Sequence, residues 1–180
     1  RESNPNFSGD ETKIVFLMEN YVSHEKRFFD QTSASLTLKN ADAFICQSSF
    51  VKGKISEQYP KKPVYETTLS IFDFFNRNLF TRESARKHLN IPTQKVILFF
   101  GLIREYKGLD KLLEAFALIK KNHADITLLI VGENYESFDK YENIISQSGI
   151  GNDVQLHLKY IANENVEPYF KAADVVCLPY

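Results

Sequence analysis

The fold of this chain is decided by residues 95–116, which read KVILFFGLIREYKGLDKLLEAF. The stretch starts with an apolar run of the kind that parallel strands show when helices cover both faces of their sheet. After a short loop delimited by Gly101 and Gly108, apolar residues recur at helical spacing with charged residues between them. These apolar positions are Leu109, Leu112, Leu113, Phe116 and Ile119. The stretch therefore predicts a buried strand, a tight turn and an amphipathic helix, which together are one unit of an α/β fold.

The same alternation of apolar runs and helical segments extends over the rest of the chain. Strands are predicted at residues 13–18, 43–46, 63–69, 95–101, 126–133, 154–161 and 174–180, and helices near 25–39, 49–59 and 82–89. Between the two halves, a segment without strand alternation ends at Pro92 and indicates a domain boundary near residue 76. We therefore expect two α/β regions with parallel sheets, residues 1–75 and 76–180. Each has fewer strands than a complete doubly wound domain.

Composition excludes several classes of protein. The 22 basic and 23 acidic residues balance, and no basic run exceeds two residues, so a nucleic-acid partner is not expected. No apolar stretch is long enough for a transmembrane helix, and the N-terminus lacks a signal-peptide pattern. The two cysteines, Cys46 and Cys177, each end an apolar run, which favours buried thiols and a cytoplasmic location. Because Met18 is the only methionine, we expect a trimmed chain.

The loop between the strand and the helix carries the chemistry that the sequence suggests. Gly101 allows a sharp turn and a close approach of a ligand to the backbone, and a helix N-terminus attracts anions. Arg104 and Lys107 lie three residues apart, and together they could grip a diphosphate. The alternative is that both are ordinary solvated charges of a surface loop. Spacing alone does not decide between the two interpretations.

Three motifs favour the diphosphate interpretation, because their order and spacing resemble those of one protein family. FFGLIREYKGLDKLLEAF, ITLLIVGE and VQLHLKYIANENVEPYFKAADVVCLPY are similar to the C-terminal domain of glycosyltransferase family 4. ENYVSHEKRFFDQTSASLTLKNADAFICQSS resembles the last part of the acceptor domain of the same family. The resemblance implies the GT-B fold of two Rossmann-like domains. Residues 1–75 would belong to the acceptor side and residues 76–180 to the nucleotide-sugar-binding side.

The resemblance also implies an activity. Enzymes of this family transfer a hexose with retention from a nucleotide-diphosphate sugar, here a UDP-sugar or GDP-sugar, to a glycan, lipid-linked or small-molecule acceptor. They use no metal or other cofactor for this step. An arginine and a lysine placed like Arg104 and Lys107 hold the donor diphosphate. The nucleobase lies against the backbone at positions that match Tyr160 and Ile161.

Other candidate residues keep two interpretations each. Glu133 ends a predicted strand on the same rim and could contact the donor, or be a solvated residue. Tyr160 could bind the nucleobase or only pack. On the acceptor side, the family more often reads His-Asn where this chain has Glu19 and Asn20. The role of the family's catalytic histidine could therefore belong to Glu19 or to His24, and His24 could equally be structural.

The pattern departs from the family at both ends. The two glutamates that hold the donor sugar follow the last strand in the family, and this sequence stops before them, so the polypeptide alone is expected to lack turnover. A non-catalytic scaffold or interaction module with the same fold is the alternative function. A nucleotide-dependent epimerase or dehydrogenase is disfavoured because no G-x-G-x-x-G follows a strand. Unfinished sheets favour a homodimer, and the intact enzyme could associate peripherally with membranes.

Overall fold

The computed structural model describes residues 12–19 and 37–180. The chain divides into two compact units between Ile71 and Phe72, and each unit is described by itself. The predicted boundary between residues 75 and 76 falls at the end of the short 3-10 helix η1 (Asp73–Phe75), inside the second unit. Within the described residues, no helix is both long and apolar enough to cross a membrane.

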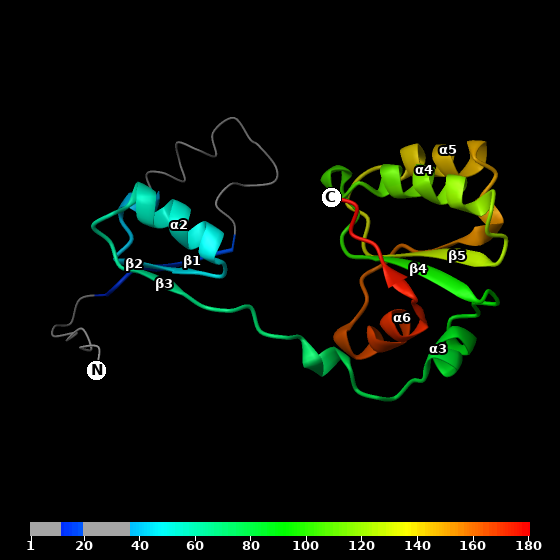
Figure 1. Cartoon of the computed structure of the whole chain (residues 1–180), viewed down its shortest axis with the longest axis horizontal. Coiled ribbons are helices and arrows are strands. Elements are labelled where there is room, and N and C mark those ends of the chain that lie inside the picture. The colour runs from blue at the N-terminus through cyan, green and yellow to red at the C-terminus, as the bar shows by residue number, and fades with distance from the viewer. Residues whose placement is uncertain (1–11, 20–36) are drawn as a thin grey trace. The chain divides into compact units, whose positions relative to one another are not determined.

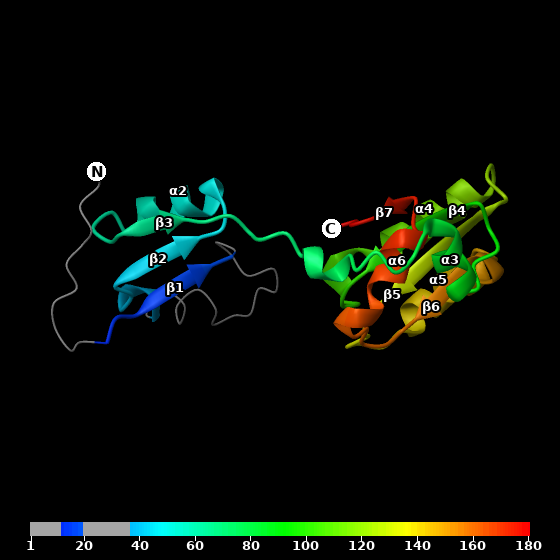
Figure 2. The same ribbon diagram turned by 90° about the horizontal axis from the view of Figure 1, so that it is seen from below.

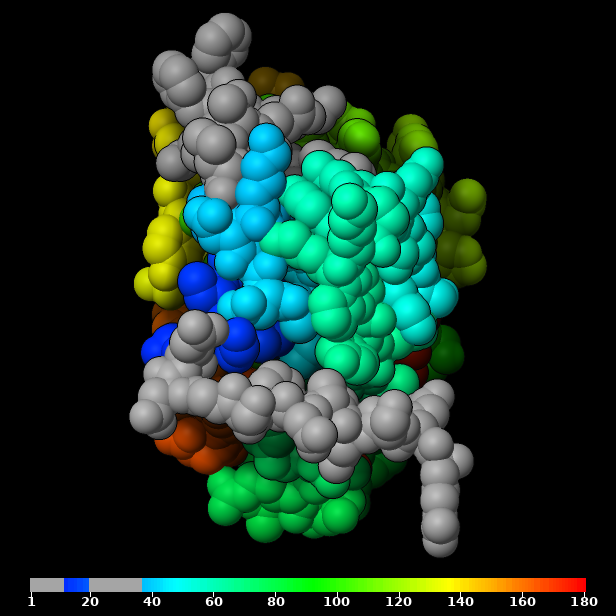
Figure 3. All heavy atoms as spheres, turned by 90° about the vertical axis from the view of Figure 1, so that its left-hand side faces the viewer, coloured from blue at the N-terminus to red at the C-terminus, as the bar shows by residue number. Residues whose placement is uncertain are grey.

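In the described residues, the first unit is a small parallel sheet with helix α2 packed on it (Figure 1). Its strand order is β1-β2-β3, with the bounds β1 (Val15–Met18), β2 (Ala43–Cys46) and β3 (Val64–Glu66). Helix α2 (Ser49–Gln58) begins where the Ser48 hydroxyl accepts a hydrogen bond from the Val51 N–H at 3.2 Å. It connects β2 to β3, and the side chains of α2 and β3, cyan to turquoise, lie next to one another in Figure 3.

The second unit is a four-stranded parallel sheet with helices on both faces. The strand order is β6-β5-β4-β7, with the bounds β4 (Lys95–Phe100), β5 (Ile126–Val131), β6 (Val154–His157) and β7 (Val175–Val176). Helices α4 (Leu109–Lys120) and α5 (Asp139–Gln147) cover one face, and α3 (Arg82–His88) and α6 (Glu167–Ala172) cover the other (Figure 1). Figure 2 shows α3 and α6 lying across the sheet, where they contact each other. Every residue of β5 is buried, as expected of a central strand covered on both faces.

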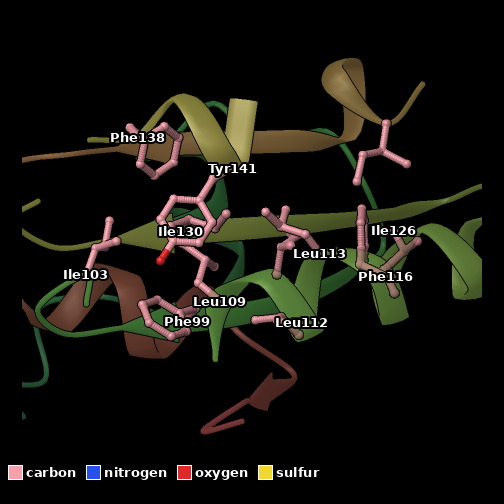
Figure 4. Close-up of a cluster of buried hydrophobic side chains, with 12 residues drawn as sticks. Phe99, Ile103, Leu109, Leu112, Leu113, Phe116, Ile126, Ile130, Phe138 and Tyr141 are labelled. Carbon is pink, nitrogen blue, oxygen red and sulfur yellow. The ribbon is translucent and has the colours of Figure 1, made fainter. Parts of the chain in front are cut away.

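Two apolar clusters hold these layers together, one on each face of the sheet. The first contains the apolar positions predicted for the helix after β4, and Figure 4 shows Leu109, Leu113 and Phe116 of α4 facing β5. It also contains Ile103, which is buried in the loop that carries the candidate site. The second cluster joins alternate residues of β4 and β5 to α3 and α6. Residues of one strand thus alternate between the clusters, because successive side chains point to opposite faces.

The structure corrects several element boundaries. Five strands end earlier than predicted: β3 at Glu66, β4 at Phe100, β5 at Val131, β6 at His157 and β7 at Val176. Helices α5 and α6 were not predicted. Most of the helix predicted at residues 25–39 lies outside the described residues. Both cysteines are free as expected, but only Cys46 is fully buried, and Cys177 is partly exposed.

Candidate functional site

The four strands of the second unit are parallel, so the loops that follow them meet at one edge of the sheet, here called the carboxyl rim. The candidate residues for donor binding all follow strand ends at this rim: Gly101, Arg104 and Lys107 after β4, Glu133 after β5, and Tyr160 and Ile161 after β6. In open α/β sheets, ligands bind outside this edge. The fold therefore assembles on one rim the residues that the sequence placed in three separate motifs.

Two glycines bring the ends of β4 and β5 into close contact. Gly132 has a φ of 146°, and a Cβ added there would lie 1.8 Å from the carbonyl oxygen of Gly101. Gly101 has a φ of 144°, yet a Cβ added to it would meet nothing within 4 Å. Glycine is therefore required at 132 for packing, while Gly101 faces open space on the side where a Cβ would stand. An approach of ligand atoms to the turn after β4 is compatible with this geometry.

The loop after β4 is anchored before it reaches the helix. The Ile103 N–H donates to the Glu133 carbonyl at 2.9 Å, and the Ile103 side chain is buried in the first cluster. A 3-10 turn, η2 (Glu105–Lys107), follows, in which the Lys107 N–H donates to the Arg104 carbonyl at 2.9 Å. Arg104 and Lys107 therefore sit at the two ends of a single turn, directly before α4.

Arg104 rests on a tyrosine from the neighbouring loop. Its guanidinium carbon lies 5.4 Å from the centre of the Tyr135 ring, which is within the range of a cation–π contact. The Tyr135 hydroxyl donates to the Glu133 carboxylate at 2.9 Å, and this hydrogen bond, together with the negative charge of Glu133, raises the pKa of Tyr135. Glu133 is partly buried, and its carboxylate is held by the Tyr135 hydroxyl. A contact of Glu133 with the donor remains a prediction.

The Lys107 ammonium contacts the rings of two other tyrosines. Its ammonium nitrogen lies 3.9 Å from the ring centre of Tyr180 and 5.1 Å from that of Tyr106. Tyr180 follows β7, whereas the Tyr135 that contacts Arg104 follows β5. Because β4 lies between β5 and β7, the two cations flank the end of β4. That both grip the same diphosphate remains a prediction.

The start of α4 completes the positive side of the rim. Gly108, with a φ of 68°, occupies the N-cap, and within the described part of the chain no side chain caps this helix. The nearest acid in the first turn, Asp110, accepts a hydrogen bond from Lys140 at 2.8 Å and another from the Lys111 N–H at 3.0 Å. The Lys140 hydrogen bond is the largest cause that lowers the pKa of Asp110. The charge of Asp110 is therefore offset by Lys140, and the helix start can still attract an anion.

Tyr160 and Ile161 differ in how far their side chains are buried. Tyr160 is 68% exposed, so its ring does not serve to pack the strand end. Ile161 is partly buried and packs against the second cluster. Both lie in the loop beyond β6, which ends at His157, and their contact with the nucleobase stays a prediction.

His157 has a structural role at the end of β6. The Gln155 side-chain nitrogen donates to the Leu89 carbonyl at 2.8 Å and lies 3.0 Å from His157 Nε2. An amide nitrogen cannot accept, so Nε2 accepts and the proton of the ring is on Nδ1, 2.9 Å from the Tyr169 hydroxyl. Burial, and secondarily the charge of Lys159, lower the pKa of His157. The network therefore requires a neutral imidazole.

The acceptor-side candidates lie in the first unit or beyond the described residues. Glu19 directly follows β1 and is exposed. His24 lies outside the described residues. The choice between Glu19 and His24 therefore remains open. Across the described ranges, no group of three or more His, Cys, Asp or Glu side chains is placed to hold a metal ion.

Sequence reasoning missed the tyrosines that hold the two cations. Tyr106 and Tyr180 stand in the quoted motifs, and Tyr135 follows the ITLLIVGE strand, but nothing in their spacing relates them to Arg104 or Lys107. The available signal was a tyrosine close to each of three strand ends. Sequence reasoning also missed a cavity of about 490 Å³, which none of the candidate residues within the described ranges line. It is lined by Phe72, Phe75, Asn76, Glu167, Phe170 and Lys171.

The chain is similar in sequence to known glycosyltransferases. The family model described as "Glycosyl transferases group 1" matches residues 81–180. A D-inositol 3-phosphate glycosyltransferase of Corynebacterium aurimucosum is 28% identical over 153 residues, which are 78% of this chain and 35% of the relative. The chain spans less than half the length of the first curated relatives that it matches.

Solved structures share the fold at low sequence identity. The structure of Anabaena Alr3699/HepE in complex with UDP and glucose superposes with a TM-score of 0.70 at 17% identity, over 91% of this chain and 45% of that protein. WaaG, a glycosyltransferase involved in lipopolysaccharide biosynthesis, gives a TM-score of 0.67 at 17% identity, over 90% of this chain and 49% of that protein. These similarities confirm the predicted GT-B fold. With the family model matching more than half of its residues, this chain belongs to the glycosyl transferases group 1 family.

Proposed function

We propose that this chain carries the diphosphate-binding part of a glycosyltransferase that moves a hexose, with retention, from a nucleotide-diphosphate sugar to a glycan, lipid-linked or small-molecule acceptor. The observation that carries the proposal is the single turn between β4 and α4 that places Arg104 and Lys107 on the carboxyl rim. Gly101 leaves open space where a Cβ would stand, and the helix start beyond it attracts anions.

The nucleotide is a uridine or guanosine diphosphate. A UDP-sugar is supported by the HepE structure, whose complex contains UDP and glucose. In this proposal Arg104 grips the diphosphate oxygens as a fork and Lys107 adds a point charge. Both stabilise the negative charge that develops on the nucleotide as it leaves, which is electrostatic catalysis by positioned charges. Tyr160 and Ile161 border the nucleobase, and Glu19 or His24 serves the acceptor side. No metal is required.

The test is nucleotide binding to the 180-residue chain by calorimetry with UDP and GDP. Arg104→Ala and Lys107→Ala should each weaken binding about tenfold or more, since each removes charge-assisted hydrogen bonds. Lys111→Ala is the matched control, because Lys111 lies one turn further on α4 and is exposed. In the intact enzyme, each of the two site substitutions should also lower turnover about a hundredfold or more.

Two results would contradict the proposal. Absence of heat with millimolar UDP and GDP would favour the alternative function, a non-catalytic module with the same fold. If Arg104→Ala, Lys107→Ala and Lys111→Ala all bound UDP and GDP equally well, the turn between β4 and α4 would not be part of the nucleotide site. We further propose that the chain alone binds the nucleotide without transferring sugar, which a glycosyl-transfer assay of the same preparation checks.

A further inference from the structure

The side chain of Lys107 lies in a corner between two aromatic rings. Tyr106 precedes it in η2, and Tyr180 reaches it from the segment after β7. The two rings meet edge to face, with centroids 6.4 Å apart and an interplanar angle of 77°. The ammonium is closer to Tyr180, at 3.9 Å from the ring centre. Two segments that are distant in the sequence therefore fix one flexible side chain.

The backbone that leads to Tyr180 packs against β4 and the loop that follows it. The Cys177 N–H donates to the Leu98 carbonyl at 2.8 Å, which ties this segment to β4. Gly108 packs on the next part of the segment so closely that an added Cβ would lie 2.7 Å from the Pro179 carbonyl oxygen. The backbone that carries Tyr180 is thus in contact with the loop that carries Lys107.

An aromatic contact leaves the charge of Lys107 available. Within the described part of the chain, Lys107 forms no ion pair with a carboxylate, whereas Lys140 pairs with Asp110 at 2.8 Å and with Glu105 at 3.8 Å. A ring face attracts an ammonium ion without supplying a formal negative charge. Lys107 is therefore held in place while its positive charge can still act on an external anion.

We propose that Tyr180 is a positioning residue whose ring holds the Lys107 ammonium at the end of β4, ready for the donor diphosphate. This inference rests on the proposed function. A lysine has several rotatable bonds, and ordering them costs conformational entropy upon binding. The tyrosine ring orders the side chain before the ligand arrives, so that less of this cost falls on the binding step.

The first experiment is calorimetric titration with UDP. Tyr180→Leu should weaken UDP binding about two- to fivefold, the range expected for loss of an exposed cation–π contact. Tyr180→Phe should bind like the wild type, because it keeps the ring. Tyr65→Leu, which removes another exposed tyrosine in β3 of the first unit, is the matched control and should have no effect. The effect of Tyr180→Leu should disappear in the Lys107→Ala background.

The second experiment detects the contact without any nucleotide. Lysines are dimethylated with ¹³C-formaldehyde, and the methyl resonance of Lys107 is identified by its loss in Lys107→Arg. A ring 3.9 Å away should shift this resonance upfield. The shift should persist in Tyr180→Phe and vanish in Tyr180→Leu.

The outcomes separate this inference from the proposed function. If Lys107→Ala weakens UDP binding and Tyr180→Leu does not, the positioning role is refuted and the diphosphate site stands. If Tyr180→Leu weakens binding equally with and without Lys107, the tyrosine acts independently of the lysine and the inference is also refuted. If the wild-type chain does not bind UDP or GDP, both proposals fall. A normal methyl shift for Lys107 in the unliganded chain refutes the contact itself.

Discussion

The stability of the second unit should depend on one arginine and hardly at all on its neighbour, although both pair with Asp174. Arg86 donates to the Asp174 carboxylate at 2.8 Å and is 16% exposed, whereas Arg82 lies 3.3 Å away and is 55% exposed. Arg86 also donates to the Gln94 carbonyl at 2.8 Å and to the Ala172 carbonyl at 3.0 Å. It therefore links α3 to the starts of β4 and β7.

The expected magnitudes follow from these contacts. Removing one partner of a fully buried ion pair costs about 3 to 5 kcal/mol, because the other charge stays buried, and the pair of Arg86 and Asp174 is partly buried. Asp174 keeps the hydrogen bond from the Val96 N–H at 2.8 Å and the exposed Arg82, so the lower end applies. We expect Arg86→Ala to lower the free energy of unfolding of the second unit by about 3 kcal/mol. Arg82→Ala should cost less than about 1 kcal/mol, as is typical of exposed ion pairs.

Unfolding in urea is measured by hydrogen exchange with detection by mass spectrometry, and exchange is monitored in peptides from α3 and β4. This readout separates the second unit from the first. In the Arg86→Ala background, Asp174→Asn should lower the free energy of unfolding little further, because the ion pair is already broken. Equal losses for Arg86→Ala and Arg82→Ala, both under about 1 kcal/mol, would refute the argument that burial decides the contribution of this pair.

Three further predictions concern stability. Burial lowers the pKa of His157 in the folded state below its ordinary value of 6.5, so the unfolded state binds the proton more readily. The contribution of His157 to stability should therefore be fully present above pH 6.5 and be lost as the pH falls through the pKa of the folded state. A pH series of urea midpoints checks this, and replacement of His157 by Gln should flatten the dependence. Gly132→Ala should destabilise the second unit by several kcal/mol, since its Cβ would lie 1.8 Å from the Gly101 carbonyl. Gly53→Ala in α2, where a Cβ meets nothing, should instead stabilise the first unit by up to about 1 kcal/mol in thermal unfolding.

Elements of strong periodicity could be predicted from the sequence, and weakly patterned ones could not. Helix α4 was predicted because its buried positions are apolar at helical spacing. Helix α6 has only six residues, and one of its buried side chains is the charged Glu167, which a hydrophobic pattern reads as exposed. Its carboxylate accepts hydrogen bonds from the Leu79 N–H at 3.0 and 3.2 Å, a partner distant in the sequence. Helix α5 buries only Tyr141 fully.

The candidate site also has features that the sequence predicts and features that it does not. The sequence alone determined the α/β units and the charged turn, because continuous apolar runs, helical spacing and the residues of a short loop are local properties of the chain. The family followed from the resemblance of three motifs in their order and spacing. Only the tertiary structure decided that Arg104 rests on Tyr135 and Lys107 on Tyr180, on opposite sides of β4. These contacts depend on the strand order β6-β5-β4-β7. Strand order comes from the packing of the whole sheet, and no local pattern records which loops it brings together.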